Sequence, residues 1–494
     1  MLSSRIFCLL LAICYSAYAG ELQDDLKARR NRVMERLGPE AMLIIWSAPT
    51  RAYSLDVNYE YRQDSNLYYL TGIDQEETVL VLMPGNRTRK EILFVKEHDP
   101  KREHWTGPAL SLADATSRSG IAKVYPAGRF DSFIYGVLSR FSFDTEADDA
   151  SSEYEAFFKA LDEGKARLAL PLRPRPGLSQ PLNPVFEFAN KIRQRFFNLS
   201  IQDTTKILAN ARQIKTPHER KLLERSVDIS NQAHLAAMRA ARPGTYEYQV
   251  KAAIEQTYKA SGAQGWSYPP IVGSGPNATI LHYEKSDRQM QSGDLLLVDA
   301  ACNYEYLTGD ITRTYPVDGS FSPAQKDIYA IVLAAQEEAM KVARPGVKLK
   351  DVEKKAAAVV KQGLLRLGLI TDSSNDQYKT WYSHDACHYI GIDVHDVGDY
   401  ESPLEPGMTF VIEPGLYIRK AALDDLPKTP ENDAFRDKVR ETIEKYNDVG
   451  IRIEDSFLLT ESGLKNLSAS VPRTVVEIER LLKERPTIRP VSGR

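Results

Sequence analysis

Cysteine is scarce in this 494-residue chain, and its scarcity excludes a disulfide scaffold. Four cysteines occur in all, and two of them, Cys8 and Cys14, lie within the first 20 residues. The remaining two, Cys302 and Cys387, cannot form the network of bridges that holds a small secreted domain together. We expect both to be small buried apolar side chains. A single bridge between them is the alternative.

An excess of charge of either sign is also missing. The 64 lysines and arginines nearly balance the 67 aspartates and glutamates, for a net charge of −3. This balance indicates neither a nucleic-acid-binding surface nor an acidic tail. Hydrophobic residues make up 43% and charged residues 27% of the chain, as in ordinary globular proteins. A chain of this length is expected to form two or three domains.

Long apolar runs are missing beyond the N-terminus, so we expect no stable membrane span. At the N-terminus, Arg5 precedes the apolar run 6–13 and the tripeptide Ala17-Tyr18-Ala19. This pattern is typical of a secretory signal peptide cleaved after Ala19, because the run is too short to cross a bilayer. We therefore expect a secreted or periplasmic protein. A short membrane anchor or an incorrectly assigned start is the alternative.

The chain after the signal peptide divides by its patterns into three parts. Residues 20–203 mix strands, as at 41–46, 78–83 and 91–96, with helices, as at 153–161, which predicts an α/β domain. Residues 204–475 form a second domain. Residues 476–494 are rich in arginine and proline without periodicity, and we expect a flexible tail.

The second domain contains an internal repeat. The tetrapeptide Ala-Arg-Pro-Gly occurs at 241–244 and again at 343–346, each time between two helical patterns. These patterns cover 217–242 and 246–261 around the first copy, and 323–344 and 349–367 around the second. The repeat predicts two pseudo-symmetric α+β halves that face one another. A site between such halves would draw its residues from both.

Five ionisable residues lie in short apolar stretches that are typical of strands or strand ends. They are Asp299, Asp310, His388, Glu413 and Glu454. Buried carboxylates raise one another's pKa and are costly to desolvate, so four of them need compensation. Two divalent cations would balance their four charges, which predicts a dinuclear metallohydrolase. A lone Asp at a strand end would be a cap, and His384 with His388 could be a helical pair; the combination is what favours metals.

This chain resembles the aminopeptidase P group of the pita-bread metallopeptidases. The resemblance covers nearly the whole mature chain and is strongest over 267–468. It rests on the stretches 271–275, 281–283, 299–314, 388–398, 406–417 and 450–455, and on 61–66 and 69–72 near the N-terminus. It implies a pita-bread catalytic domain with a pseudo-twofold repeat, preceded by the α/β domain typical of creatinase and its relatives.

The resemblance also implies a role for each of the five residues. Asp299 would chelate one metal, Asp310 and Glu454 would bridge both, and His388 and Glu413 would complete the other site. Oxygen ligands with one imidazole favour Mn²⁺, with Zn²⁺, Co²⁺ and Fe²⁺ as alternatives. The implied reaction is hydrolysis of the bond before a proline at position 2 of a peptide, by a hydroxide that bridges the two metals.

Further residues are assigned through the resemblance. It implies catalytic roles for His282, His395, Glu413 and Arg452, and contacts with the peptide for His384, Tyr417 and Trp105. Some relatives present the aromatic at the position of Trp105 to a neighbouring subunit, and we expect a homo-oligomer, either a dimer or a tetramer. An ordinary core or surface tryptophan, and second-sphere packing for the histidines, are the alternatives.

Other functions remain open at this point. A prolidase would use the same metals but accept only dipeptides. A non-catalytic binding protein on the same fold is a second alternative, although the ligand positions are intact. A methionine aminopeptidase is disfavoured by the large N-terminal domain. The charged, helix-prone segment 418–446 is either a solvated insertion or a part of the cleft or of an oligomer contact.

Overall fold

The computed structural model describes residues 2–141, 150–172 and 183–485. The chain divides into two compact units, Met1–Arg212 and Gln213–Arg494. This division falls later than the predicted boundary after residue 203. The reason lies in α9 (Thr205–Gln213), whose Leu208 and Ala211 are buried. The carbonyl of Ala211 also accepts a hydrogen bond of 2.6 Å from the Tyr69 hydroxyl, which ties this segment to unit 1.

Unit 1 begins with a long helix, α1 (Leu2–Leu37). Its later turns bury Leu26, Val33 and Leu37, which pack into the domain. The helix runs through the expected cleavage point after Ala19, so cleavage stays a prediction. Across the parts of the chain that the structure describes, no helix is both long and apolar enough to cross a membrane.

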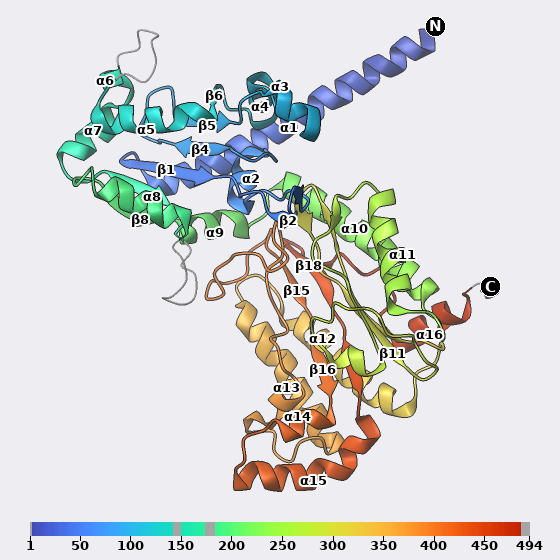
Figure 1. The fold of residues 1–494 in the computed structure, drawn as a ribbon. Helices are drawn as coiled ribbons and strands as arrows, with labels where there is room; N and C mark the ends of the chain where they lie inside the picture. Colours follow the sequence, from blue (N-terminus) through green and yellow to red (C-terminus); the bar gives the residue numbers. More distant parts are fainter. Residues whose placement is uncertain (1, 142–149, 173–182, 486–494) are drawn as a thin grey trace. The chain divides into compact units, whose positions relative to one another are not determined.

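Unit 1 is built around a six-stranded sheet in the order β6-β5-β4-β1-β7-β8 (Figure 1). Its strands are β1 (Ala41–Trp46), β4 (Val79–Leu82), β5 (Glu91–Val95), β6 (Lys123–Pro126), β7 (Arg167–Leu170) and β8 (Ser200–Asp203). Consecutive residues of β1, such as Ile44 and Ile45, are both buried, because helices cover both faces of the sheet. The three strands expected from the sequence are confirmed.

The other elements of unit 1 are short. They are β2 (Ala52–Ser54), β3 (Val57–Asn58), α2 (Ser65–Thr71), α3 (Pro100–Thr106), α4 (Leu112–Ser119), η1 (Ala127–Arg129), α5 (Phe130–Ser139), α6 (Ala150–Glu153), α7 (Glu155–Asp162) and α8 (Pro184–Arg193). Helix α7 confirms the predicted helical pattern. Its Phe157, Phe158 and Leu161 are buried in the hydrophobic core of unit 1.

The first half of unit 2 contains one helix pair and two small sheets. Its elements are α10 (Pro217–Ala240), α11 (Glu247–Ala260), β9 (Gly265–Trp266), β10 (Ile271–Ser274), η2 (Gly275–Thr279), β11 (Leu295–Asp299), β12 (Cys302–Tyr304), β13 (Leu307–Thr308) and β14 (Thr312–Pro316). The sheets have the orders β10-β11-β14 and β13-β12-β9. Thr216 begins α10 with a capping box to Glu219, as its sequence predicts.

The second half repeats this plan. Its elements are α12 (Pro323–Val342), α13 (Leu349–Leu367), η3 (Asp376–Thr380), β15 (Thr409–Ile412), β16 (Gly415–Ile418), α14 (Lys420–Asp424), α15 (Pro430–Tyr446), β17 (Val449–Arg452), β18 (Asp455–Thr460), β19 (Gly463–Asn466) and α16 (Val475–Lys483). Gly244 and Gly346 end the two Ala-Arg-Pro-Gly copies with φ of 87° and 89°. Such positive φ favours glycine, so the repeated tetrapeptide makes the same turn twice.

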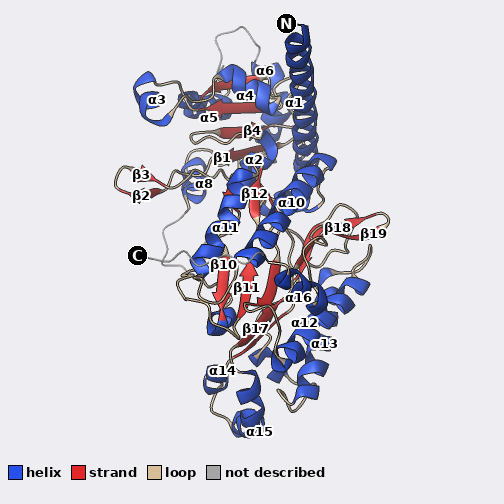
Figure 2. Ribbon diagram, turned by 90° about the vertical axis from the view of Figure 1, so that its right-hand side faces the viewer, coloured by secondary structure: helices blue, strands red, loops and turns tan. Residues whose placement is uncertain are grey.

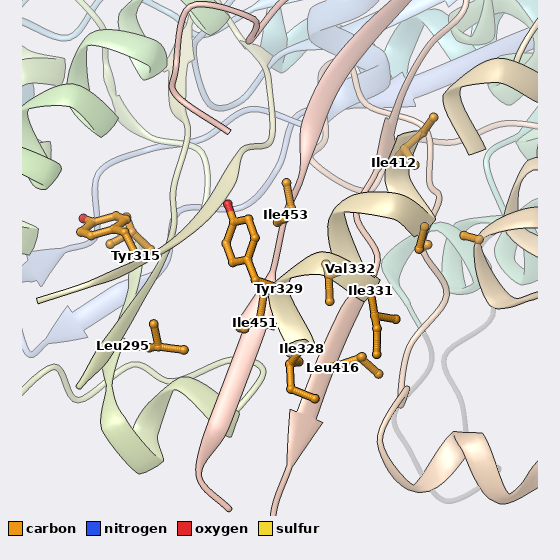
Figure 3. Close-up of a cluster of buried hydrophobic side chains, with 14 of the residues drawn as sticks. Leu295, Tyr315, Ile328, Tyr329, Ile331, Val332, Ile412, Leu416, Ile451 and Ile453 are labelled. Carbon is orange, nitrogen blue, oxygen red and sulfur yellow. The ribbon is translucent and has the colours of Figure 1, made fainter. Parts of the chain in front are cut away.

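One hydrophobic core joins the two halves of unit 2. Figure 3 shows Tyr329 and Val332 of α12 close to Ile451 of β17 and Leu416 of β16, with Leu295 and Tyr315 of the first half to one side. All of these side chains are buried. Each of the aliphatic side chains among them contributes about 1.5–3 kcal/mol when it leaves water. In Figures 1 and 2 the strands of unit 2 lie between the α10–α11 and α12–α13 pairs.

The C-terminal part of the chain is more ordered than the sequence predicts in two places. Helix α16 occupies the start of the predicted tail 476–494, because Thr474 forms a capping box with Glu477 and the helix buries Ile478 and Leu482. The tail prediction was therefore wrong up to residue 483, and residues 486–494 lie outside those described. In the segment 418–446, α15 buries Phe435 in the core, so the segment is not simply a solvated insertion.

The two remaining cysteines are both buried and free. The alternative of a bridge between Cys302 and Cys387 is therefore wrong. Their role as small buried side chains is the one the structure supports.

A fully buried ion pair lies beneath the loop that carries His395. The ammonium of Lys215, just before α10, is 2.8 Å from Asp396, and each side chain is 1% exposed. We predict that Lys215→Met lowers the free energy of unfolding by about 3–5 kcal/mol, because it removes the positive charge that lies 2.8 Å from a buried carboxylate. Urea denaturation measures this change.

The double variant Lys215→Met with Asp396→Leu is the control. It removes both charges and should recover most of the lost stability. A single Lys215→Met variant as stable as the parent would contradict the prediction.

Candidate metal centre

The pairing of β11 with β14 brings the first two carboxylates together. Asp299 ends β11 opposite Thr312, and Asp310 lies two residues before Thr312. The hydroxyl of Tyr268 donates to Asp299 Oδ1 at 2.6 Å and also contacts Asp310 Oδ1. The strands pair as the sequence predicts, and the residues between them form the small hairpin β12–β13.

Glu454 reaches the same place from the second half. It lies between β17 and β18, and its backbone N–H donates to the carbonyl of Thr312 at 3.1 Å. The hydroxyl of Thr312 in turn donates to Glu454 Oε2 at 2.7 Å. Glu454 Oε1 is buried without a hydrogen-bond partner. One carboxylate oxygen is therefore satisfied by the fold and the other is left available for a ligand.

His388 and Glu413 approach from two neighbouring segments of the second half. Glu413 follows β15, and its N–H donates to the carbonyl of Ala386 at 2.7 Å, while Val411 N–H donates to His388 O at 2.9 Å. This pairing places His388 Nε2 3.3 Å from Glu413 and 3.5 Å from Asp310. His384 and His388 lie in an irregular segment, so the alternative of a helical pair is wrong.

The five residues singled out from the sequence converge. Their candidate ligand atoms lie within 4.8 Å of one another in overlapping groups of three. These groups are Asp299 with Asp310 and Glu454, His388 with Glu413 and Glu454, and Asp310 with His388 and His395. Overlapping groups that share Asp310, His388 and Glu454 have the composition that two adjacent cation sites require.

Burial and repulsion distort the acid–base properties of this cluster. Burial and the charge of Asp299 raise the pKa of Asp310, and burial and the charge of Asp310 raise the pKa of Glu454. Burial would lower the pKa of His388, but the carboxylate of Glu413 raises it to about 9. The groups therefore hold protons that cations could replace.

A cavity of about 420 Å³ opens onto the cluster. Its lining includes most of the residues predicted to act on a substrate, together with three of the carboxylates. The lining residues are Leu281, His282, Asp299, Asp310, His384, Asp385, Cys387, His388, His395, Tyr400, Glu413 and Arg452. Such a concave, polar-lined space beside perturbed acids is a candidate active site.

Arg452 lines the cavity and is hydrogen-bonded to Tyr417. The guanidinium of Arg452 donates to Asp299 Oδ2 and to the Tyr417 hydroxyl, each at 2.6 Å, and to Thr312 at 3.0 Å. The Tyr417 hydroxyl also lies 2.8 Å from His384 Nε2. Arg452 therefore orients a candidate ligand and a candidate substrate-binding pair at once.

The imidazoles of the cavity are held in different ways. His395 stacks on His388 with ring centroids 4.0 Å apart. Burial and the neighbouring His388 lower the pKa of His395, and burial lowers the pKa of His384. Neutral rings at these positions could donate or accept a hydrogen bond near neutral pH. His282 also lines the cavity.

Trp105 belongs to a different unit of the chain from the cavity residues. It belongs to α3 of unit 1 and is 85% exposed, whereas every cavity residue belongs to unit 2. Its contact with a substrate stays a prediction.

Two supporting residues were missed in the sequence. Tyr268 joins Asp299 to Asp310, and Thr312 joins Glu454 to Arg452. Thr312 lies only two residues after Asp310, at the start of β14, so its place in the sequence could have indicated that it lies near the site. Nothing in the Tyr-Pro-Pro stretch at Tyr268 indicates that its hydroxyl would meet two carboxylates.

The donor set fits divalent cations. Buried carboxylate oxygens with one imidazole suit Mn²⁺ and similar hard ions. The unpartnered Oε1 of Glu454 and the raised pKa values of Asp310 and Glu454 show that the protein's own donors do not satisfy these groups.

Comparison with known proteins agrees with this geometry. The family model for metallopeptidase family M24 matches residues 221–461, and that for the aminopeptidase P N-terminal domain matches 26–142. The chain is 32% identical to the Xaa-Pro aminopeptidase of Escherichia coli K12, covering 93% of this chain and 98% of that one. It is 28% identical to human Xaa-Pro aminopeptidase 3, covering 94% and 87%.

Solved structures extend the likeness to the whole fold. Aminopeptidase P from E. coli with the inhibitor Pro-Leu matches with a TM-score of 0.77 at 31% identity, covering 93% of this chain and 98% of that one. Aminopeptidase PepP from Pseudomonas aeruginosa matches with the same TM-score and coverage at 32% identity. The predicted fold class, an α/β domain followed by a pita-bread domain, is confirmed. The chain is a peptidase and belongs to the aminopeptidase P group of metallopeptidase family M24.

Proposed function

We propose that this protein is a dinuclear-metal aminopeptidase that cleaves the bond between the first residue of a peptide and a proline at position 2. The observation that carries the proposal is the convergence of Asp299, Asp310, His388, Glu413 and Glu454 in one cluster, four members of which line a single cavity. The relatives named Xaa-Pro aminopeptidase support the choice of substrate.

Two divalent ions, of which Mn²⁺ suits the ligands best, would be held by these five residues. Zn²⁺ and Co²⁺ are the alternatives. When bound, such ions would supply a water of lowered pKa as the nucleophile for hydrolysis. Among the chain's own groups, Glu413 is placed to accept and return a proton, since it lies at the cavity wall beside His388 and His384.

The histidines of the cavity would position the peptide. His282 and His395 would donate hydrogen bonds to the oxygen that gains charge and to the leaving side. His384 and Tyr417, held by Arg452, would shape the pocket for the proline ring. An Xaa–Pro bond is a tertiary amide without an N–H, so a peptidase that grips that N–H fails on it. A rigid pocket beside two metals avoids this requirement.

Peptide length separates this proposal from a prolidase. An aminopeptidase P turns over Xaa-Pro-Yaa tripeptides, whereas a prolidase accepts only Xaa-Pro dipeptides. Parallel assays with Mn²⁺ and a matched pair of such peptides test the proposal. Turnover of the dipeptide alone would assign the protein to prolidase, and no metal-dependent turnover of either would favour a binding protein.

We also infer that the protein is exported after cleavage behind Ala19, and that it forms a dimer or tetramer. The sequence pattern at the N-terminus supports export. Mass spectrometry of the mature N-terminus and light scattering of the purified protein test these two inferences. A mature chain that still begins at Met1 would overturn the first, and a monomer the second.

Asp310→Ala should remove one of the two carboxylates, Asp310 and Glu454, that are proposed to bridge both metal sites. We predict that it lowers the metal content below two ions per chain and lowers kcat by more than the roughly 10–100-fold typical of residues that only support a ligand. Elemental analysis and a peptide assay measure the two effects.

The control for Asp310→Ala is Asp351→Ala. Asp351 is an acid on α13 that pairs at the surface with Lys354. It should leave both metal content and kcat unchanged. Full activity in Asp310→Ala would contradict the dinuclear proposal.

His282→Ala and His395→Ala should separate catalysis from metal binding. Each removes a hydrogen-bond donor near the reacting carbonyl, so we predict that kcat falls by about 100–1,000-fold. Metal content should stay at the parent level, because neither residue belongs to the five ligands. His98→Ala, at an exposed histidine of unit 1, is the matched control. Loss of metal from His395→Ala would show instead that His395 is a ligand.

Metal binding should release protons. Without cations the pKa of His388 lies at about 9, so its ring is protonated at pH 7 and must lose that proton to bind an ion. The affinity for Mn²⁺ should therefore rise with pH below this value, by about tenfold per pH unit for each proton released. Calorimetry in two buffers with different heats of ionisation counts these protons. A binding heat that does not depend on the buffer would contradict the prediction.

A further inference from the structure

The segment between Tyr382 and His388 carries two functional histidines but has no helix or strand of its own. A segment without an internal hydrogen-bond ladder depends on its neighbours for a fixed position. On one side the Ala386 carbonyl accepts a hydrogen bond of 2.7 Å from the N–H of Glu413. This contact joins the segment to the end of β15.

The opposite side of the segment is held by Glu353. This residue lies on α13, one turn after its start, and is partly buried. Its Oε1 accepts a hydrogen bond of 2.9 Å from the Tyr382 hydroxyl, and its Oε2 accepts one from the Ala386 N–H. A single carboxylate therefore binds both ends of a five-residue stretch, 382–386.

We propose that Glu353 is a positioning residue, which fixes this segment against α13 and thereby sets His384 and His388 in the metal centre. The inference rests on the dinuclear centre proposed above. Glu353 does not line the cavity, so it acts through the segment and not on a substrate.

Glu353 is linked to His388 and Glu413 through the backbone of one residue, Ala386. The N–H of Ala386 binds Glu353, and the carbonyl of the same residue binds the N–H of Glu413. The position of Ala386 is thus fixed from both sides. Because His388 follows two residues later, a shift of the Ala386 backbone would move His388 relative to Glu413, 3.3 Å away.

Glu353 reaches His384 through Tyr382. The ring of Tyr382 stacks on His384, with centroids 6.2 Å apart and planes inclined by 17°. The far edge of His384 meets the hydroxyl of Tyr417. With its hydroxyl bound to Glu353, Tyr382 forms a fixed wall that holds the His384 ring toward the cavity.

The surroundings of Glu353 bring its pKa close to neutral pH, where both its neutral and its charged form are populated. Burial raises the pKa of Glu353 to about 7, against the hydrogen bonds from Tyr382 and Ala386 that lower it. The charges of Asp385 and Glu413 raise it further. A neutral carboxylic acid keeps both contacts, because its O–H can donate to the Tyr382 oxygen while its carbonyl accepts from Ala386. A glutamine has the same capacity.

The test is the affinity of the metal-stripped full-length protein for Mn²⁺, measured by calorimetry. Glu353→Ala frees the segment, and we expect the affinity to fall by about 10–100-fold, as for other residues that orient metal ligands. Glu353→Gln should recover most of the affinity. Tyr382→Phe, which leaves the Ala386 contact in place, should cost less than Glu353→Ala.

Two further measurements separate positioning from general destabilisation. Asp351→Ala, two residues away on the same helix, should bind Mn²⁺ as the parent does, and thermal melting reports the stability of each variant. Parent-like affinity in Glu353→Ala, or equal losses in Glu353→Ala and Asp351→Ala, would overturn the inference. The parent protein could bind Mn²⁺ but cleave no Xaa-Pro peptide, and the proposed function would then fail. A loss of Mn²⁺ affinity in Glu353→Ala would still uphold the positioning role of Glu353.

Discussion

Mutual repulsion among buried carboxylates is the constraint on which the catalytic unit depends. Asp299, Asp310 and Glu454 are buried and meet the partly buried Glu413 beside the cavity, where an unpaired charge is costly. The fold opposes this repulsion by tying the two halves together at the cluster: Arg452 of β17 binds Asp299 of β11, and Thr312 of β14 binds Glu454. Each contact joins a carboxylate of one half to a donor of the other. The halves cannot separate without exposing both.

The surrounding architecture explains how such a cluster can persist. Leu295 and Tyr315 of the first half and Ile328, Ile451 and Ile453 of the second share one apolar core beside the site (Figure 3). The hydrophobic contribution of this core offsets the electrostatic cost of the cluster. Around it, the candidate ligands lie at strand ends or in the irregular segment that contains His388, and four of the five line the cavity. Because these groups are held at the ends of strands in a rigid scaffold, the carboxylates stay in position despite their mutual repulsion.

Much of this could be predicted from the sequence, for identifiable physical reasons. Capping residues such as Thr216 act locally, so helix starts were accurate. The five candidate ligands could be found because charge inside apolar stretches is unusual. The long-range contacts could not: Tyr268 meets Asp310 across 42 residues, and Glu353 meets Ala386 across 33. Helix α16 was missed because its short pattern is stabilised by Ile478 and Leu482 packing on a distant core. Single-sequence patterns report local preferences, whereas these features depend on tertiary partners.

The distribution of donors within the cluster also bears on how two ions would be shared. Asp299 has a protein donor on each oxygen, from Tyr268 and Arg452. Glu454 has a donor on one oxygen only, and Asp310 has Tyr268 on one oxygen and His388 at 3.5 Å from the other. Burial and like charge raise the pKa of Asp310 and Glu454. These two are the carboxylates with the most uncompensated charge, so they gain the most from contact with two cations. This distribution of donors supports the proposal that Asp299 serves one ion and that Asp310 and Glu454 bridge both.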